Sequence, residues 1–454
     1  MRQRGTILVA VLAVTALAAM VAVSLLFVMR AEVAASAAAV QGEQARAAAM
    51  SGIRLAAGLA LTAGAEIDAW TDNPSLLRNR LVFDDGRDRW YFVVWADNPA
   101  DPGAVRYGLT DEAGKVNLNV ADAETLAALP GMTDALVDAL IDWRDSDDEA
   151  RPQGAEREYY ETRPMAYAIR NGSLPTLEEL LLVRGFDARV VYGEDANLSG
   201  LLDPNEDDFL ERFPPDDADG LLATGLRRLT TVWSRDPNVD ALGRPRLDIN
   251  GDTEALDDAD LPEATPRYIR LLRAEGHTFG HPAELLEARY QLRKTPKGEP
   301  GLKAGDWITS GVGLDELPTV LDRLTVGDGG VSGLVNVNTA RAVVLAALPG
   351  IDENLALRIL DTRGRLAAAE KTTPAWLLTQ GLVNQEEFIE VARHLTARGY
   401  QYHIQSIGFG VPCGRFAVVE AVVDFADGAA RVVYLRDVTR LGLPFALDVE
   451  TLEI

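Results

Sequence analysis

The N-terminus contains an uncharged stretch that constrains the rest of the chain. No residue between Thr6 and Met29 is charged, and a helix of that length crosses a bilayer core about 30 Å thick. Arg2 and Arg4 precede the stretch, and basic flanks stay on the cytoplasmic side of a membrane. We therefore expect a single transmembrane helix over residues 6–29, with the bulk of the chain outside the cytoplasm.

The helical pattern does not stop at the end of the apolar stretch. Strong helix formers continue without proline, which predicts one helix over residues 6–65. Its outer half is expected to pack against a soluble domain through an apolar stripe made of Val33, Val40, Ala47, Met50, Ile53 and Ala57. The alternative is a cleaved signal peptide, but such a signal has a shorter apolar core and a small-residue cut site before the mature chain.

Length and charge narrow the classes of protein. The chain has 454 residues, which is too long for one small core, and its formal net charge is -25. Nucleic-acid partners need a basic surface, so this charge opposes them, whereas acidic side chains suit hard cations. Cys413 is the only cysteine, which excludes a disulfide within the chain.

Strand patterns lie at both ends of the extracytoplasmic part. RWYFVVW, residues 89–95, reads as a buried strand, and alternation over residues 105–109 predicts a second one. Three more strands are expected at residues 402–407, 415–425 and 431–436, with a hairpin turn at Asp427–Gly428. The predicted fold class is α+β: a small α/β domain formed by residues 66–116 and 397–454, interrupted by a large, mostly helical domain over residues 117–396.

An internal repeat marks the inserted domain. VNLN at residues 116–119 and VNVN at residues 335–338 are each followed by LAALPG and by a helical segment that ends in arginine, Arg144 or Arg363. We expect the asparagines of both copies to cap helices or tie turns. Residues 227–251 are a looser echo of the lead-in, and residues 194–260 form an acidic, loop-rich insertion.

The LPG hairpins have two interpretations. Helix-hairpin-helix units of this kind bind DNA phosphates through backbone N–H groups, which would make the chain a membrane-anchored DNA-binding protein of a competence or type IV pilus system. Here the hairpin tips carry Thr133, Asp352 and Glu353, and carboxylates repel phosphate, so helix packing is favoured. No catalytic constellation stands out, and we expect no enzyme.

One acidic segment has the spacing of a calcium loop. Oxygen-bearing side chains and a turn glycine occur from residue 195 to residue 206 in the order of an EF-hand loop. The expected calcium ligands are Asp195, Asn197, Ser199, the backbone carbonyl of Leu201, Asp203 and Glu206. The alternative is a plain acidic turn.

Several of these features, taken in order, resemble one protein family. A short basic leader that ends in Gly5 and joins a spanning helix directly resembles the signal of type IV pilins and type II secretion pseudopilins. The motifs DEAGKVNLNVA, LPG, DWRDSDDEARPQGAEREYY, YAIRNGSLPTLEELLLVRGF and VNVNTA resemble type II secretion protein K, over roughly residues 4–186 and from 333 onward. Ala10 stands where most pseudopilins have glutamate, and the protein K family normally lacks that glutamate.

The resemblance implies the remaining expectations. Residues 1–5 would be a leader that prepilin peptidase removes between Gly5 and Thr6, and methylation of the new N-terminus is a family trait. The chain would be a minor pseudopilin in the inner membrane, with a periplasmic, pilin-like domain at the tip of the pseudopilus, and with other minor pseudopilins and the major pseudopilin as partners. It would support pseudopilus initiation and export across the outer membrane. The resemblance also implies a cation, which we expect to be calcium, at Asp145, Asp147, Asp148 and Glu156, where the alternative is a solvated acidic loop.

Overall fold

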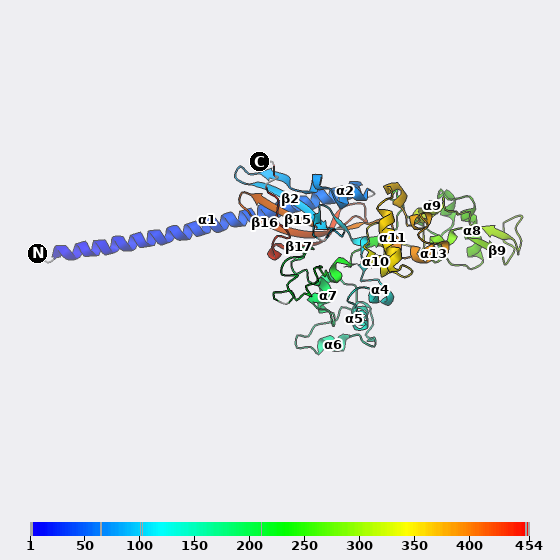
Figure 1. The fold of residues 1–454 in the computed structure, drawn as a ribbon, viewed down its shortest axis with the longest axis horizontal. Helices are drawn as coiled ribbons and strands as arrows, with labels where there is room; N and C mark the ends of the chain where they lie inside the picture. Colours follow the sequence, from blue (N-terminus) through cyan, green and yellow to red (C-terminus); the bar gives the residue numbers. More distant parts are fainter. Residues whose placement is uncertain are drawn as a thin grey trace.

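One continuous helix organises the structure, which is a computed structural model that describes residues 3–63, 66–99, 101, 103–209, 211–449 and 452. Helix α1 spans Gln3–Ala63, 61 residues, and its first half projects away from the rest of the molecule (Figure 1). Within the described part, this is the one helix long and apolar enough to cross a membrane, with a segment of mean hydropathy 2.7 that no other part of the chain buries. Residues 1–2 of the predicted leader and the predicted helix end at residues 64–65 lie outside the described residues.

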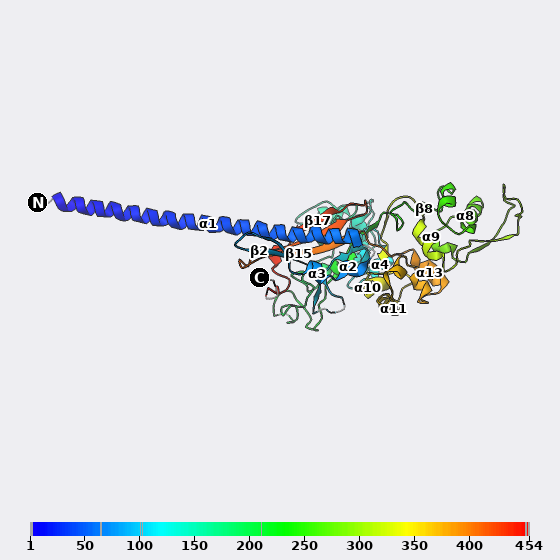
Figure 2. The same ribbon diagram turned by 90° about the horizontal axis from the view of Figure 1, so that it is seen from above.

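The second half of α1 lies along one face of a sheet (Figure 2). Its buried residues recur every three or four positions: Ala45, Ala48, Ala49, Gly52, Ile53, Ala56, Ala57 and Ala60. The predicted stripe is therefore wrong for Val33, Val40 and Ala47, which are exposed. Val33 and Val40 precede the part of α1 that the sheet reaches, and a strict heptad repeat drifts around a helix of 3.6 residues per turn.

The sheet is antiparallel and is made by two separate segments of the chain, residues 80–111 and 401–437. Its order is β1-β2-β15-β16-β17, with short β3 beside β2 and β4 beside β15. The strands are β1 (Arg80–Asp84), β2 (Arg89–Asp97), β3 (Val105–Arg106), β4 (Thr110–Asp111), β15 (Gln401–Val411), β16 (Phe416–Asp424) and β17 (Arg431–Asp437). Helices α2 (Ile67–Thr71) and α3 (Pro74–Leu77) precede it. The α+β fold class and the strand at residues 89–95 are confirmed.

Alternation along the strands gives the sheet two buried faces. Phe92, Val94 and Ile404 pack against α1, whereas Tyr91, Val93 and Trp95 pack on the opposite face with the C-terminal residues Phe445 and Leu447. The predicted strand over residues 105–109 is shorter than expected. Beyond Arg106 the chain passes so close to α2 that a Cβ on Gly108 would lie 1.9 Å from the Thr71 carbonyl oxygen, and Leu109 N–H donates to Trp70 O instead of to a strand.

The chain between β4 and β15 forms three consecutive units, each closed by a two-residue parallel strand pair. The first unit pairs β5 (Val116–Asn117) with β6 (Thr230–Thr231), the second pairs β8 (Leu247–Asp248) with β11 (Leu324–Thr325), and the third pairs β13 (Val335–Asn336) with β14 (Leu395–Thr396). The helices of the first unit are α4 (Ala123–Ala127), α5 (Asp134–Arg144), α6 (Arg157–Glu161) and α7 (Ala188–Tyr192). Those of the second and third are α8 (Ala264–Ala274), α9 (Leu317–Arg323), α10 (Ala342–Ala346), α11 (Glu353–Arg363), α12 (Trp376–Thr379) and α13 (Gln385–Ala392). The second unit adds a hairpin of β9 (Arg289–Gln291) and β10 (Trp307–Thr309), and β7 (Arg235–Asp236) pairs with β12 (Val331–Ser332) between units.

Asparagines tie the turn that follows the first strand of each unit, as the sequence predicts. Asn119 exchanges two hydrogen bonds with the backbone of Leu174, and Asn250 exchanges the same two with Phe279. In the third unit, Asn338 donates to Lys371 O and accepts from the Trp376 indole N–H. The predicted repeat therefore has a structural counterpart in all three units.

An arginine near the end of one helix closes each unit. Arg144 donates to Leu118 O, Arg273 to Gly251 O and Arg363 to Val337 O. The predicted echo at residues 227–251 is divided: its start closes the first unit, and its end opens the second. The sequence pattern does not predict the second unit as a full copy of the repeat, because this unit lacks LPG.

Two neighbouring arginines join the inserted domain to the sheet. Arg227 lies 2.5 Å from Glu420 of β16, and Arg228 lies 2.6 Å from Asp97 at the end of β2. Arg341 of the third unit also pairs with Asp97. Burial alone would raise the pKa of Glu420 and of Asp97, but the arginines lower both below their usual range. Both carboxylates therefore stay ionised, and folded stability should be lost as the pH falls below their unfolded pKa values near 4.

Close helix–sheet packing gives the first prediction. A Cβ on Gly408 of β15 would lie 2.0 Å from the Ala45 carbonyl oxygen, so Gly408→Val should push α1 off the sheet. We expect a loss of about 1–3 kcal/mol in the free energy of unfolding, measured by denaturant unfolding of the full chain in detergent. The control is Gly58→Ala, where a Cβ meets nothing within 4 Å. Equal stability of the two variants would contradict the packing.

The buried pairs give the second prediction. Arg227→Met removes the closest cation of the Glu420 carboxylate, which is 1% exposed and still has Arg436 at 3.6 Å, and should cost about 1.5–3 kcal/mol of unfolding free energy. The double variant Arg227→Met/Glu420→Met removes both charges and should recover most of that loss. A double variant no more stable than the single one would show that the loss comes from packing and not from the lost charge pair.

Candidate functional site

The first acidic loop leaves the end of α5 in the first unit. Thr133 caps the start of this helix by accepting from Leu136 N–H, and the chain turns extended at Asp145. Asp142, in the last turn, is fully buried. The i,i+3 spacing places the Asp142 and Asp145 side chains on the same side of the helix end.

Three carboxylates converge at this loop. Asp142, Asp145 and Glu156 each offer an oxygen, and these oxygens lie within 4.8 Å of one another. Asp145 Oδ1 and both carboxylate oxygens of Glu156 are buried without any hydrogen-bond partner. Gly154 makes room for the group, since a Cβ there would lie 1.9 Å from Asp142 Oδ2.

The electrostatics of this group suit a divalent cation. Burial, followed by the charges of Asp142 and Asp145, raises the pKa of Glu156 to about 7. Burial also raises the pKa of Asp142 and of Asp145. A hard cation with oxygen ligands would supply the missing partners and the opposite charge. The three residues therefore fit the cation that the sequence predicts here.

The predicted ligands divide into two groups. Asp145 and Glu156 are in the cluster, whereas Asp147 and Asp148 are exposed and lie outside the three converging carboxylates. Asp147 Oδ1 accepts from Glu149 N–H, and Asp148 pairs with Arg157 at 3.2 Å. Asp142 was missed because it lies inside α5, although its spacing from Asp145 was a usable signal.

The second acidic loop, residues 195–206, lies after α7, in a stretch without helix or strand among the described residues 193–225. Asp195, Ser199 and Glu206 are buried. Asn197 Oδ1 accepts from Ser199 N–H, and Ser199 Oγ accepts from Leu201 N–H. Asp203 Oδ2 accepts from Asn197 Nδ2 at 2.7 Å. These bonds tie the loop together, but Asp195, Asp203 and Glu206 are not among the described carboxylates whose oxygens lie within 4.8 Å of one another.

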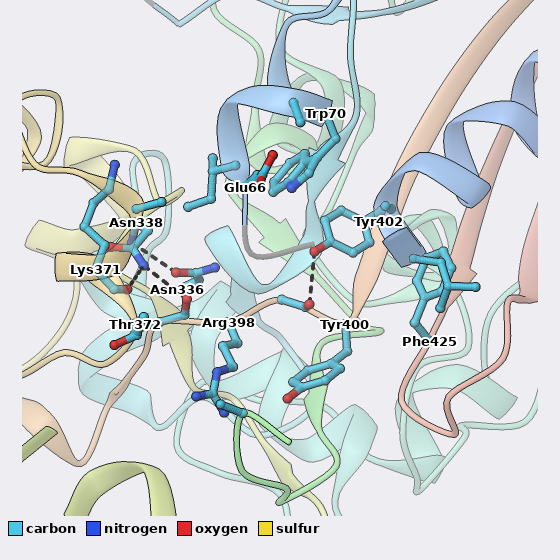
Figure 3. Close-up of a pocket in the computed structure, with 18 of the residues that line it drawn as sticks. Glu66, Trp70, Asn336, Asn338, Lys371, Thr372, Arg398, Tyr400, Tyr402 and Phe425 are labelled. Carbon is cyan, nitrogen blue, oxygen red and sulfur yellow. Dashed lines mark hydrogen bonds between the residues drawn. The ribbon is translucent and has the colours of Figure 1, made fainter. Parts of the chain in front are cut away.

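A cavity of about 660 Å³ lies where the end of α1, the sheet and the third unit meet (Figure 3). Figure 3 shows Asn336, Asn338 and Lys371 on one side and Trp70 and Tyr402 on the other. Their polar groups are largely used internally: Asn338 donates to Lys371 O, and the Tyr402 hydroxyl donates to Gly399 O. The cavity is therefore a gap at a domain junction and not a set of convergent catalytic groups.

The predicted processing site lies at the start of α1. The backbone of Gly5 and Thr6 is helical, continuous with the apolar segment. From Gln3 onward, the start of the chain is thus part of the same helix as the apolar segment.

The first cluster yields the third prediction, which separates the structural ligand set from the sequence-based one. Asp142→Asn should weaken calcium binding to the full chain by at least about tenfold, because it removes charge from a buried ligand group. Asp148→Asn, the matched control, should leave that affinity within about twofold, since an exposed charge acts weakly. Isothermal titration calorimetry measures both. A larger loss for Asp148→Asn would contradict the geometry.

Part of this chain is similar to known proteins. Residues 109–192 match the family model of the first domain of type II secretion system protein K. The crystal structure of the GspK-GspI-GspJ complex from the type 2 secretion system of enterotoxigenic Escherichia coli contains a chain 11% identical to this one, with a TM-score of 0.40, over 87% of this chain and 96% of that chain. No curated protein sequence matches. The matched segment holds β5, α4, α5 and the first carboxylate cluster, and this part of the chain is similar to the first domain of type II secretion system protein K.

Proposed function

We propose that this chain is the minor pseudopilin at the tip of a type II secretion pseudopilus, where it supports pseudopilus initiation and export across the outer membrane. The observation that carries this proposal is the protein K match over residues 109–192, in a chain whose long apolar helix lies on an antiparallel sheet. In such a filament the α1 helices bundle together, and the sheets cover the bundle.

The position of the inserted domain supports the tip. The second and third units extend beyond the end of the sheet that is farthest from the N-terminus of α1, whereas the first unit lies beside the sheet (Figure 1). A subunit stacked above would need the space that this domain occupies. The chain therefore suits a filament end that has nothing above it.

Ala10 supports the same position. In other pseudopilins a glutamate at this depth pairs with the amine of a neighbouring subunit, and an unpaired carboxylate in lipid costs about 3 kcal/mol. A first subunit has no such neighbour above it. An alanine avoids that cost.

The partners and location follow from the assignment. The other minor pseudopilins and the major pseudopilin would contact the exposed apolar part of α1, and prepilin peptidase would process it. The chain would cross the inner membrane once, with its N-terminus in the cytoplasm and the sheet and inserted domain in the periplasm.

The DNA-binding alternative is weaker. At the hairpin tips, Thr133 and Asp352 accept hydrogen bonds from the first-turn N–H groups of α5 and α11. Those N–H groups are therefore already satisfied, and the Asp352 carboxylate would repel a phosphate.

Calcium is the proposed cofactor of the first cluster. Asp142, Asp145 and Glu156 would hold the ion, and the ion would supply a positive charge to balance these three carboxylates. The effect of the calcium ion would be structural, since the ion would fasten the loop at residues 145–156 to the end of α5.

Processing provides the fourth prediction and the test of the proposed function. In cells that carry the secretion system but lack this chain, the parent chain should restore secretion, and N-terminal sequencing of the membrane-extracted protein should start at Thr6. Gly5→Leu should stay unprocessed and restore at most about a tenth of the secretion. Gly42→Ala, where a Cβ meets nothing within 4 Å, is the control and should behave as the parent does.

Two results would overturn the proposal. A mature N-terminus beyond Ala31 would identify an ordinary signal peptide. Full secretion by an unprocessed Gly5→Leu chain would remove the need for a processed pseudopilin.

A further inference from the structure

The loop at residues 195–206 contains a buried carboxylate oxygen without a partner. Asp195 is 2% exposed, and its Oδ1 accepts no hydrogen bond. Its Oδ2 accepts from Gly200 N–H at 3.1 Å, on the opposite side of the loop, and from Arg228 at 3.0 Å. Oδ2 is thus held between the loop backbone and Arg228, and burying the unpaired charged Oδ1 beside it is costly.

The other end of the loop presents a second buried carboxylate. Glu206 is 1% exposed, and its two oxygens accept from Ala196 N–H at 3.0 Å and from Asp203 N–H at 3.1 Å. These bonds hold the Glu206 carboxylate between the start of the loop and its last turn. A carboxylate in that place can bind a cation through both oxygens.

From this geometry we infer that residues 195–206 form a calcium site outside the segment that matches protein K. Asp195 Oδ1, Asn197, Ser199, the Leu201 carbonyl and Glu206 supply the oxygen ligands, and Asp203 contributes through a water molecule. Gly200, with φ of +71°, makes the turn that brings the two ends together.

The hydrogen bond between Asn197 and Asp203 is compatible with the site. Position nine of such loops usually reaches calcium through water, so Asp203 can keep its contact with Asn197. Flexible seven-oxygen coordination suits calcium, whereas magnesium demands a small octahedral shell. We therefore expect a loop site of this kind to bind calcium more tightly than magnesium.

Arg228 gives the site a mechanical consequence. Its guanidinium contacts Asp195 Oδ2 and also lies 2.6 Å from Asp97 at the end of β2. Calcium on Oδ1 and Arg228 on Oδ2 share one carboxylate, so ordering the loop also fixes Arg228 against the sheet. The site thus steadies the junction of the inserted domain with the sheet.

The fifth prediction concerns the number of calcium ions that the full chain binds in detergent, measured by equilibrium dialysis. The calcium concentration is about 5 mM, which exceeds the dissociation constant of about 0.1–1 mM expected for an extracellular loop. Glu206→Gln and Asp195→Asn should each bind one ion fewer than the parent. Glu211→Gln makes the same charge change at an exposed position nearby and should bind as the parent does. Hydrogen exchange at the amides of residues 195–206 should slow in calcium but not in equal magnesium.

The outcomes separate this inference from the proposed function. An unchanged ion count in both variants, or exchange at residues 195–206 that ignores calcium, overturns the site and leaves the secretion assay untouched. A loss of one ion in either variant supports the site, provided that the variant melts in chelator at the same temperature as the parent. This result would stand even if the Gly5→Leu experiment overturned the proposed function.

Discussion

Two adjacent arginines hold this molecule together. Arg227 and Arg228 leave the first unit side by side and reach different strands of the sheet, at Glu420 and Asp97. Both carboxylates lie in surroundings that would otherwise neutralise them, and these arginines, together with Arg341 at Asp97 and Arg436 at Glu420, keep them charged. A domain inserted between two strands has only its two chain crossings and such contacts to fix its orientation. These pairs therefore help to set the angle of the inserted domain relative to α1, and the proposed tip position depends on that angle.

Small residues perform the equivalent task between α1 and the sheet. Alanines and Gly52 line the buried side of the helix, and Gly408 lets the β15 backbone approach the Ala45 carbonyl. Large side chains would hold the helix farther away. The exposed apolar half of α1 carries bulkier residues such as Leu25 and Phe27, as expected for a surface that meets lipid or other apolar helices. The part of α1 after about Gln41 thus packs on the sheet through small residues, whereas the part before it exposes bulky apolar residues.

The inserted domain repeats one solution three times. A two-residue parallel pair is too short to be stable alone, so each unit adds an asparagine that ties the turn and an arginine that closes the helix onto backbone carbonyls. Both acidic loops lie in the first unit, one after α5 and one after α7. The middle unit has the same strand pair, asparagine and arginine although it lacks LPG. Backbone ties to a few polar side chains therefore preserve the unit better than the hairpin motif does.

The sequence by itself determined the long N-terminal helix, the strand segments, the repeat and the spacing of both acidic loops, because each depends on local periodicity or on fixed offsets between neighbouring residues. Only the tertiary structure decided which face of α1 is buried, since that depends on where the sheet ends. It also brought Asp142 into the first cluster in place of Asp147 and Asp148, because burial against Gly154 is a contact between separate turns. The pairing of Arg228 with both Asp97 and Asp195 was likewise beyond the sequence, because no local pattern records which buried charges, 131 and 33 residues away, will pair with a given arginine.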